Sequence, residues 1–281
     1  MSAVPTTEAA SGYLSRLIGF VGLSLAQLVR APSHSRRAEA GRFWARRSLA
    51  LGAVTVMVII ALMYALDAFE IGLMPARGTA WLWPVRILTD FGKSSYVLWT
   101  LFAILIMLAL LAPRLRGMSR SLLISFGTRI QYIFLAVMVS VLAGEIIKGI
   151  VGRGRPFVGG VANPFNFSHF AWSEAYASFP SGHATTSFAL AFAVSAVWPR
   201  LRMAMFGYAL IIIATRLVLL AHHPSDVVAG ALTGVIGAMA VRYWFAARHL
   251  AFTIHSDGTI DPLPGPAPGH LKRVAREAFA P

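Results

Sequence analysis

The stretch TRLVLLAHHPSD, residues 215–226, joins two apolar runs of the chain, 203–221 and 227–246. The first run ends abruptly in two histidines, a proline and an aspartate, and an arginine lies six residues before the first histidine. A single polar group is common at the end of a helix, but four within this short stretch indicate a functional site. The apolar runs on either side decide where in the molecule such a site lies.

The composition is that of a membrane protein. Of the 281 residues, 57% are hydrophobic and 13% are charged, whereas an average soluble domain has roughly 25% charged residues. A transmembrane helix needs about 20 predominantly apolar residues. The sequence therefore predicts an all-α, polytopic protein with six transmembrane helices, at 48–66, 95–112, 130–147, 184–198, 203–221 and 227–246, of which the fourth is short.

The two ends of the chain differ from this apolar middle. Apolar residues between 14 and 28 recur at helical spacing, but the segment is too short and too polar at its flanks to span a bilayer. We predict an amphipathic helix on the membrane surface, with a loosely ordered basic leader as the alternative. The tail after about Thr253 contains the Pro- and Gly-rich sequence DPLPGPAPGH and is predicted to be disordered.

The distribution of Lys and Arg predicts the orientation of the helices. With six spans both termini lie on one side, and 18 of the 25 basic residues fall in the segments on that side. By the positive-inside rule the termini are cytoplasmic. The expected organisation is a cytoplasmic segment over 1–47, a six-helix membrane domain over 48–246 and a cytoplasmic tail over 247–281. Richness in Arg and Ala is typical of a GC-rich bacterium, so the predicted location is the bacterial inner membrane.

Several other classes of protein and site are disfavoured. The net charge of +14 is spread through the loops between apolar runs, which favours a topology signal over nucleic-acid binding. The absence of cysteine excludes disulfides, thiolate chemistry and Cys-ligated zinc. We predict neither a metal nor another cofactor, because five further histidines show no ligand-like spacing: His34, His169, His249, His255 and His270.

Three polar clusters are predicted to meet at the extracytoplasmic surface. The third run ends in KGIVGRGRP (148–156), the fourth begins with FPSGHATT (179–186), and the last two runs are joined by the stretch 215–226. The ends of odd spans and the starts of even spans emerge on the same face of the membrane. Clusters far apart in the sequence are therefore expected to form one site.

The cations of the first and third clusters and the start of the second favour a phosphate ligand. Lys148, Arg155 and Arg216 are costly at a membrane boundary unless they line a polar cavity or bind an anion, and the guanidinium group suits bidentate contact with phosphate oxygens. Ser181 and Gly182 stand where a helix should begin, and free N–H groups at a helix N-terminus bind anions.

The histidines add a base or nucleophile. If HHPSD opens the last helix, His222 and Asp226, four residues apart, face the same side of it, and a carboxylate bonded to one ring nitrogen makes the other a better base or nucleophile. His183, on another segment, is the second titratable group. His223 points roughly 100° away from His222 and is expected to pack or to face solvent. Arg153 and Glu145 are interpreted as structural, Glu145 as an i+3 partner of a lysine.

These clusters resemble the three-part signature of the type 2 phosphatidic acid phosphatase superfamily: KGIVGRGRP (148–156), PSGH (180–183) and RLVLLAHHPSD (216–226). With the six-span layout the resemblance covers roughly residues 48–246. Two positions depart from the family's usual pattern, since Thr215 stands in place of a serine and His223 in place of an aromatic residue. Neither change removes a group that catalysis needs.

The resemblance implies a metal-independent phosphatase in which His222 attacks phosphorus and forms a phosphohistidine, while His183 protonates the leaving oxygen. By the same resemblance, the phosphate is held by Lys148, Arg155, Ser181, Gly182 and Arg216.

The expected function is removal of phosphate from a lipid phosphate or lipid pyrophosphate at the periplasmic face. Candidate substrates are undecaprenyl pyrophosphate, lipid A, phosphatidylglycerol phosphate and phosphatidic acid. A lipid phosphotransferase would use the same histidine with a different acceptor. A transporter is a weaker alternative, because it would favour polar residues in the middle of the membrane.

Overall fold

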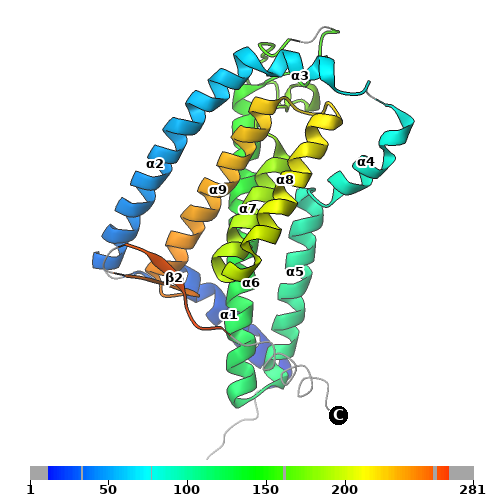
Figure 1. The fold of residues 1–281 in the computed structure, drawn as a ribbon. Coiled ribbons are helices and arrows are strands. Elements are labelled where there is room, and N and C mark those ends of the chain that lie inside the picture. The colour runs from blue at the N-terminus through cyan, green and yellow to red at the C-terminus, as the bar shows by residue number, and fades with distance from the viewer. Residues whose placement is uncertain (1–11, 33, 77, 161–162, 256–257, 266–281) are drawn as a thin grey trace, which may run out of the picture.

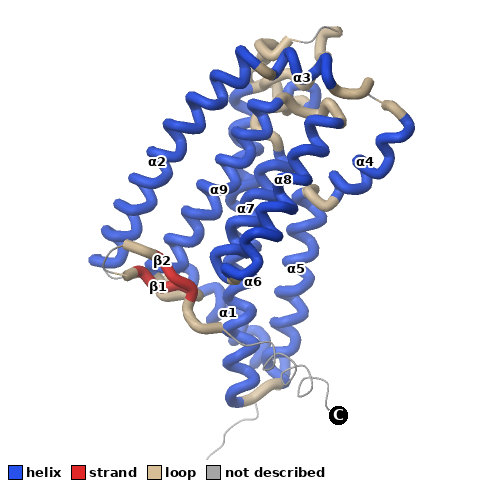
Figure 2. Tube along the Cα trace, viewed as in Figure 1, coloured by secondary structure: helices blue, strands red, loops and turns tan. Residues whose placement is uncertain are grey.

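The structure is a computed structural model, and it describes residues 12–32, 34–76, 78–160, 163–255 and 258–265. Helices make up most of this part of the chain (Figure 1), so the all-α prediction is confirmed. The helices are α1 (Tyr13–Val29), α2 (His34–Ala65), α3 (Asp67–Leu73), α4 (Trp83–Asp90), α5 (Ser94–Leu111), α6 (Gly117–Val151), α7 (Gly182–Val197), α8 (Arg202–Val218) and α9 (Pro224–Ala247). Strands β1 (Phe252–Ile254) and β2 (Ile260–Pro262) form an antiparallel hairpin (Figure 2).

Five helical stretches of the described chain are long and apolar enough to cross a membrane. They are Trp44–Ala65, Ala80–Arg114, Gly117–Val151, Pro199–Val218 and Pro224–Ala247. Each contains most or all of one predicted run. The remaining run, 184–198, corresponds to α7, which has 16 residues and is therefore only about 24 Å long. The count of six holds only when this shorter helix is included.

Helix α7 can be short because it lies inside the bundle. It packs against α6, α8 and α9, and most of its buried residues are Ala, Ser or Thr. Two glycines of α9 allow close approach: a Cβ at Gly230 would lie 2.4 Å from the Ser181 oxygen, and one at Gly234 would lie 2.4 Å from the Thr185 oxygen. Small residues four apart are typical of closely packed membrane helices. A helix that neighbours surround need not match the thickness of the lipid.

One end of the bundle collects the elements that carry the polar clusters. The α2–α3 corner, the end of α6, the starts of α7 and α9 and the end of α8 lie near the top of Figure 1, whereas α1 and the hairpin lie near the bottom. The α4–α5 turn also approaches this end of the bundle, because a Cβ at Gly92 would lie 3.1 Å from a ring carbon of His183.

The terminal segments agree only partly with the sequence prediction. Helix α1 is present and none of its residues is buried, so the expected N-terminal helix is confirmed, while its place on the membrane surface stays a prediction. The expectation of disorder from about residue 253 is wrong for the hairpin. Phe252 is fully buried and its ring lies 4.8 Å from that of Tyr132, so one aromatic anchor holds this segment on the bundle. Residues 266–281 lie outside the described chain.

Candidate active site

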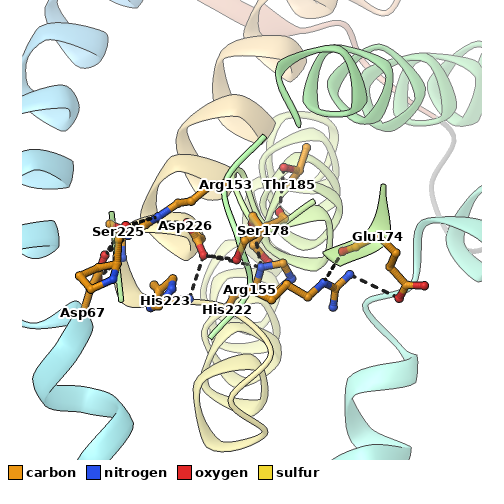
Figure 3. A network of polar contacts seen from close by, with 12 residues as sticks. Asp67, Arg153, Arg155, Glu174, Ser178, Thr185, His222, His223, Ser225 and Asp226 are labelled. Atoms are coloured by element: carbon orange, nitrogen blue, oxygen red, sulfur yellow. Dashed lines mark hydrogen bonds and ion pairs between the residues drawn. The ribbon is translucent and has the colours of Figure 1, made fainter. Parts of the chain in front are cut away.

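The first cluster leaves helix α6 in an extended conformation because the helix ends at a left-handed glycine. Gly152 has φ 58°, and a Cβ there would lie 1.8 Å from the Ser168 carbonyl oxygen. The chain then pairs with the following loop through a bridge between Arg153 and Phe167. This turn places Arg153 on the inner side of the site and Arg155 near its rim (Figure 3).

His222 lies in the short α8–α9 connection and is 3% exposed. Its Nδ1 is 2.9 Å from the Ser178 carbonyl oxygen. Since a carbonyl only accepts hydrogen bonds, Nδ1 carries the proton and Nε2 keeps its lone pair. Burial lowers the pKa of His222 well below 6.5, Arg216 and Arg155 lower it further, and the Ser178 hydrogen bond opposes them. The imidazole is therefore neutral at neutral pH.

The expected contact between Asp226 and the His222 ring is not made. The Asp226 Oδ2 atom lies 3.9 Å from His222 Nδ1, beyond hydrogen-bonding distance. Instead, Oδ2 accepts from the Ser178 hydroxyl at 2.6 Å and from the His223 backbone N–H at 2.9 Å. Asp226 is close to His222, as the spacing predicts. Ser178 bridges the two residues, since its hydroxyl donates to the Asp226 carboxylate and its carbonyl accepts from the His222 ring.

Arg153 binds the other carboxylate oxygen of Asp226. Its Nη1 lies 2.6 Å from Asp226 Oδ1 and its Nη2 lies 2.7 Å from Asp67 Oδ2. All three side chains are buried (Figure 3). The interpretation of Arg153 as merely structural missed this connection. His223, also fully buried, packs inside the protein, and the alternative that it faces solvent is wrong.

The predicted phosphate-binding cations approach from three elements. Arg216 on α8 donates from Nη1 to the Thr89 hydroxyl at 2.9 Å. Arg155 donates from Nε to the Glu174 carbonyl at 3.0 Å, and its Nη2 lies 3.6 Å from a Glu174 carboxylate oxygen. Lys148, at the end of α6, forms an ion pair with Glu145 as the i+3 spacing predicts. Two of the three cations thus carry exposed carboxylate partners that an incoming phosphate can displace.

The start of α7 faces the same region. The Ser181 N–H donates to the Asp226 carbonyl at 2.9 Å, which fixes α7 against α9, and a Cβ on Gly182 would lie 3.0 Å from Lys148 Nζ. Within the described chain, three buried atoms of the predicted site have no hydrogen-bond partner: Ser181 Oγ, His183 Nε2 and Arg216 Nε. Buried polar groups normally find partners, so these atoms fit a ligand that supplies acceptors.

A cavity of about 330 Å³ lies beside two of the predicted phosphate-binding cations, Lys148 and Arg155. It is lined by Glu145, Lys148, Gly149, Arg155, Trp172, Ser173, Glu174, Tyr176 and Ala177. His183, His222 and Arg216 are not among its lining residues. Among the described residues, no group of three or more His, Cys, Asp and Glu side chains is arranged to hold a metal ion.

The structure brings the eight predicted site residues to one end of the bundle, and it adds four that the sequence analysis did not select: Asp67, Thr89, Arg153 and Ser178. Asp67 directly follows the first apolar run, and a carboxylate at that boundary was the one available signal. Ser178 contacts the His222 ring through its backbone carbonyl, which no sequence pattern reveals.

Comparison with known proteins places this site in context. A family model described as the PAP2 superfamily, the type 2 phosphatidic acid phosphatases, matches residues 130–250. A lipid A 1-phosphatase of Rhizobium johnstonii is 32% identical over 214 residues, covering 73% of this chain and 84% of the relative. One of Rhizobium etli is 32% identical over 181 residues, covering 64% and 72%.

A more distant match is a putative undecaprenyl-diphosphatase, YbjG, of Escherichia coli. It is 32% identical over 120 residues, covering 42% of this chain and 58% of the relative. No solved structure shows significant similarity to the chain.

Proposed function

Since the chain belongs to the PAP2 superfamily and is a membrane phosphatase, we propose that it hydrolyses a lipid phosphate through a covalent phosphohistidine on His222. The observation that carries this proposal is the state of the His222 ring. Its Nδ1–H is tied to the Ser178 carbonyl at 2.9 Å and burial disfavours its protonated form. The Nε2 lone pair is therefore available at neutral pH without a separate base.

In the first step His222 Nε2 attacks phosphorus. An N–P bond forms, the bond between phosphorus and the leaving oxygen breaks, and the electron pair departs with that oxygen. His183, whose Nε2 is buried without a partner in the described chain, donates the proton that the leaving oxygen needs. To do so it must be protonated in the substrate complex, where the dianionic phosphate favours the imidazolium form.

In the second step water replaces the histidine. Neutral His183 accepts a proton from the water, whose oxygen attacks phosphorus, and the N–P bond breaks with its electron pair returning to His222 Nε2. Inorganic phosphate leaves and both histidines regain their starting states. Acid and base roles thus alternate on one side chain, as microscopic reversibility requires for a two-step displacement.

The cations supply the electrostatic part of catalysis. Arg216, Arg155 and Lys148 hold the phosphate, together with the N-terminus of α7 at Ser181 and Gly182. Groups fixed before the reaction and aimed at developing charge stabilise a transition state strongly. With three cations and the N-terminus of α7 available to one anion, the mechanism needs no divalent ion.

The proposed substrate is a phosphate group of lipid A. The two relatives that align over most of their length are named lipid A 1-phosphatases. Undecaprenyl diphosphate is the second candidate, since the shorter match carries that name. Both lipids present their headgroup at a membrane surface, and the positive-inside rule supports a bacterial inner-membrane enzyme whose site faces the periplasm.

The test is a purified-protein assay in detergent, with EDTA present, on lipid A, undecaprenyl diphosphate, phosphatidylglycerol phosphate and phosphatidic acid. Release of inorganic phosphate is expected, with an acid-labile phosphoenzyme trapped on rapid quenching. His222→Ala should abolish both, by orders of magnitude in rate, whereas His255→Ala, at an exposed histidine of the hairpin, should not.

Three results would contradict the proposal. Activity that requires added magnesium or zinc would remove the metal-independent mechanism. Full activity of His222→Ala would remove the phosphohistidine. Transfer of phosphate to a second lipid with no free phosphate released would identify a phosphotransferase instead.

A further inference from the structure

A buried network of charged and polar groups extends behind His222 toward helix α3 (Figure 3). Its members are Asp67, Arg153, Ser178, Ser225 and Asp226, each at most 1% exposed. They come from four parts of the chain: the start of α3, the segment after α6, the segment before α7 and the start of α9. Asp67 lies outside residues 130–250, the range of the family match.

We infer that Asp67 and Arg153 are positioning residues for the His222 imidazole, acting through Asp226 and Ser178. The inference rests on the proposed role of His222 as nucleophile and deepens it. Neither residue lines the cavity beside the predicted phosphate-binding cations. Their effect is to fix the Ser178 carbonyl, and that carbonyl decides which ring nitrogen of His222 carries the proton.

Arg153 is held with every donor in use. A guanidinium group has five N–H donors, and the structure gives five bonds. Two join the carboxylates of Asp226 and Asp67, one joins the Ser225 hydroxyl at 2.6 Å, and two reach the Pro164 carbonyl, from Nε at 2.9 Å and from Nη2 at 2.7 Å. Lysine has three donors on a single atom and cannot reproduce this planar arrangement.

Asp67 anchors the far end of the network. Besides Arg153, its carboxylate accepts hydrogen bonds from the backbone N–H of Ser225 at 3.0 Å and from the Ser225 hydroxyl. Ser225 lies in the first turn of α9, one residue before Asp226. Asp67 therefore fixes both the guanidinium group and the helix start from which Asp226 projects.

Ser178 is the point where the network meets the nucleophile. Its N–H donates to the Arg153 carbonyl at 3.0 Å, its hydroxyl donates to Asp226 Oδ2 at 2.6 Å, and its carbonyl accepts from His222 Nδ1 at 2.9 Å. Arg153 thus fixes Ser178 in two ways: the Arg153 carbonyl accepts from the Ser178 N–H, and the Arg153 side chain binds Asp226, which accepts from the Ser178 hydroxyl. A shift of the guanidinium group would move the carbonyl that orients the ring.

The charges make the network sensitive to single changes. One guanidinium group lies between two buried carboxylates, so removing Arg153 would leave two uncompensated buried charges, whereas neutralising one carboxylate keeps a balanced pair and removes one charge-assisted bond. Neutralising Asp67 while keeping its shape is the mildest disturbance. The amide oxygen of asparagine can still accept from the Ser225 N–H, but the ion pair with Arg153 is lost.

The experiment measures phosphoenzyme formation per active site in Asp67→Asn, using the full-length protein in detergent and rapid quenching. The expected result is a formation rate roughly 10- to 100-fold lower, the size of loss found when a hydrogen-bond partner that orients a metal-binding side chain is removed. The inhibition constant of inorganic phosphate should change less than about threefold, because the cations that hold phosphate are untouched. A merely structural role would lower the active fraction but not the rate per site.

The matched control is Glu70→Gln, an equally conservative change of a buried carboxyl on the same helix. Glu70 is 7% exposed, and neither of its carboxylate oxygens has a hydrogen-bond partner in the described chain. This variant should form phosphoenzyme at the wild-type rate. If it slowed the reaction as much as Asp67→Asn, charge loss on α3 in general would explain the effect and the inference would fail.

A double-mutant cycle tests the connection itself. No direct contact joins Asp67 and Ser178. If the two residues act separately, the double variant should lose phosphoenzyme formation rate by the product of the two single fold-losses. If both act through Asp226, the loss in the double variant should be smaller than that product. Multiplying effects would overturn the inference. If Asp67→Asn does not accumulate in the membrane, Ser225→Ala, which removes a hydroxyl bonded to Asp67 and Arg153, replaces it under the same criteria.

The failure of the proposed function is distinguishable from the failure of this inference. His222→Ala, measured in parallel, should give no phosphoenzyme. If it does form one, His222 is not the nucleophile. If it does not, but Asp67→Asn reacts at the wild-type rate, the nucleophile stands and the positioning role is wrong.

Discussion

Glu70 on α3 gives a sharp test of the electrostatics around the site. Its side chain is buried, and both carboxylate oxygens lack a hydrogen-bond partner within the described residues. Burial, and secondly the negative charge of Asp67, raises the pKa of the Glu70 carboxyl to about 7 from an ordinary value of 4.5. Glu70→Gln replaces this group by a neutral one of nearly the same shape.

The size and sign of the effect follow from the two pKa values. Below pH 4.5 the carboxyl is protonated in both folded and unfolded chains, so it does not affect the free energy of unfolding. Between pH 4.5 and about 7 the unfolded chain loses the proton first, and the free energy of unfolding falls as the pH rises. Above pH 7 the loss of unfolding free energy caused by Glu70 is constant. It amounts to up to about 3 kcal/mol, because each unit of pKa difference corresponds to 1.36 kcal/mol.

The assay is thermal unfolding of the purified protein in detergent at pH 4.5 and at pH 8, followed by tryptophan fluorescence. Glu70→Gln should unfold several degrees above the wild type at pH 8 and within about one degree of it at pH 4.5. The control is Asp261→Asn on the exposed hairpin, which should shift neither value. A Glu70→Gln variant less stable than the wild type at pH 8 would refute the reasoning, because it would mean that the carboxylate has a stabilising partner.

Two further predictions concern orientation and leaving-group protonation. The wild-type chain contains no cysteine, so a single introduced cysteine reports its own side of the membrane. A cysteine replacing exposed Asn163, near the site, should react with a membrane-impermeant thiol reagent in intact spheroplasts. A cysteine replacing exposed Ser121, at the opposite end of α6, should not react. The reverse labelling would place the site in the cytoplasm. His183→Ala should lower kcat/KM far more for a substrate with a poor alkoxide leaving group than for a nitrophenyl phosphate, which needs little protonation. Equal losses on both substrates would mean that His183 binds phosphate and does not act as the acid.

The sequence was sufficient to predict the candidate site's location but not its internal contacts. Consecutive spans cross the membrane in opposite directions, so counting the apolar runs predicts that the end of α6, the start of α7 and the α8–α9 turn lie at the same end of the bundle. The spacing of four residues also predicted that Asp226 lies near His222, but α9 begins at Pro224, so His222 precedes the helix and the two residues do not share a helix face. The spacing could not show that Ser178 lies between them, because its carbonyl is a backbone group brought in from 44 residues away.

Arg153 and Asp67 were missed for a related reason. Arg153 lies two residues before Arg155. From the sequence alone it could equally be a flanking residue that reaches toward the membrane surface or a part of the site. Its role depends on partners 86 and 73 residues away in the sequence, and one of them lies on a short helix that no apolar run marks. Long-range ion pairs leave no periodic signal, so only the folded chain distinguishes the two interpretations.

The network also addresses a physical problem of membrane enzymes, which is how separate helices keep the same height. Lipid tails are as apolar as leucine side chains, so the hydrophobic effect does little to stop one helix from sliding along another. A site assembled from four chain segments loses its geometry if one of them moves by a fraction of a helical turn. The Asp67–Arg153–Asp226 contacts join the α2–α3 corner, the end of α6 and the start of α9 by directional, charge-assisted bonds. Polar groups at this end of the bundle therefore fix the relative heights of the helices, and a change at Asp67 is felt at His222 without touching the substrate.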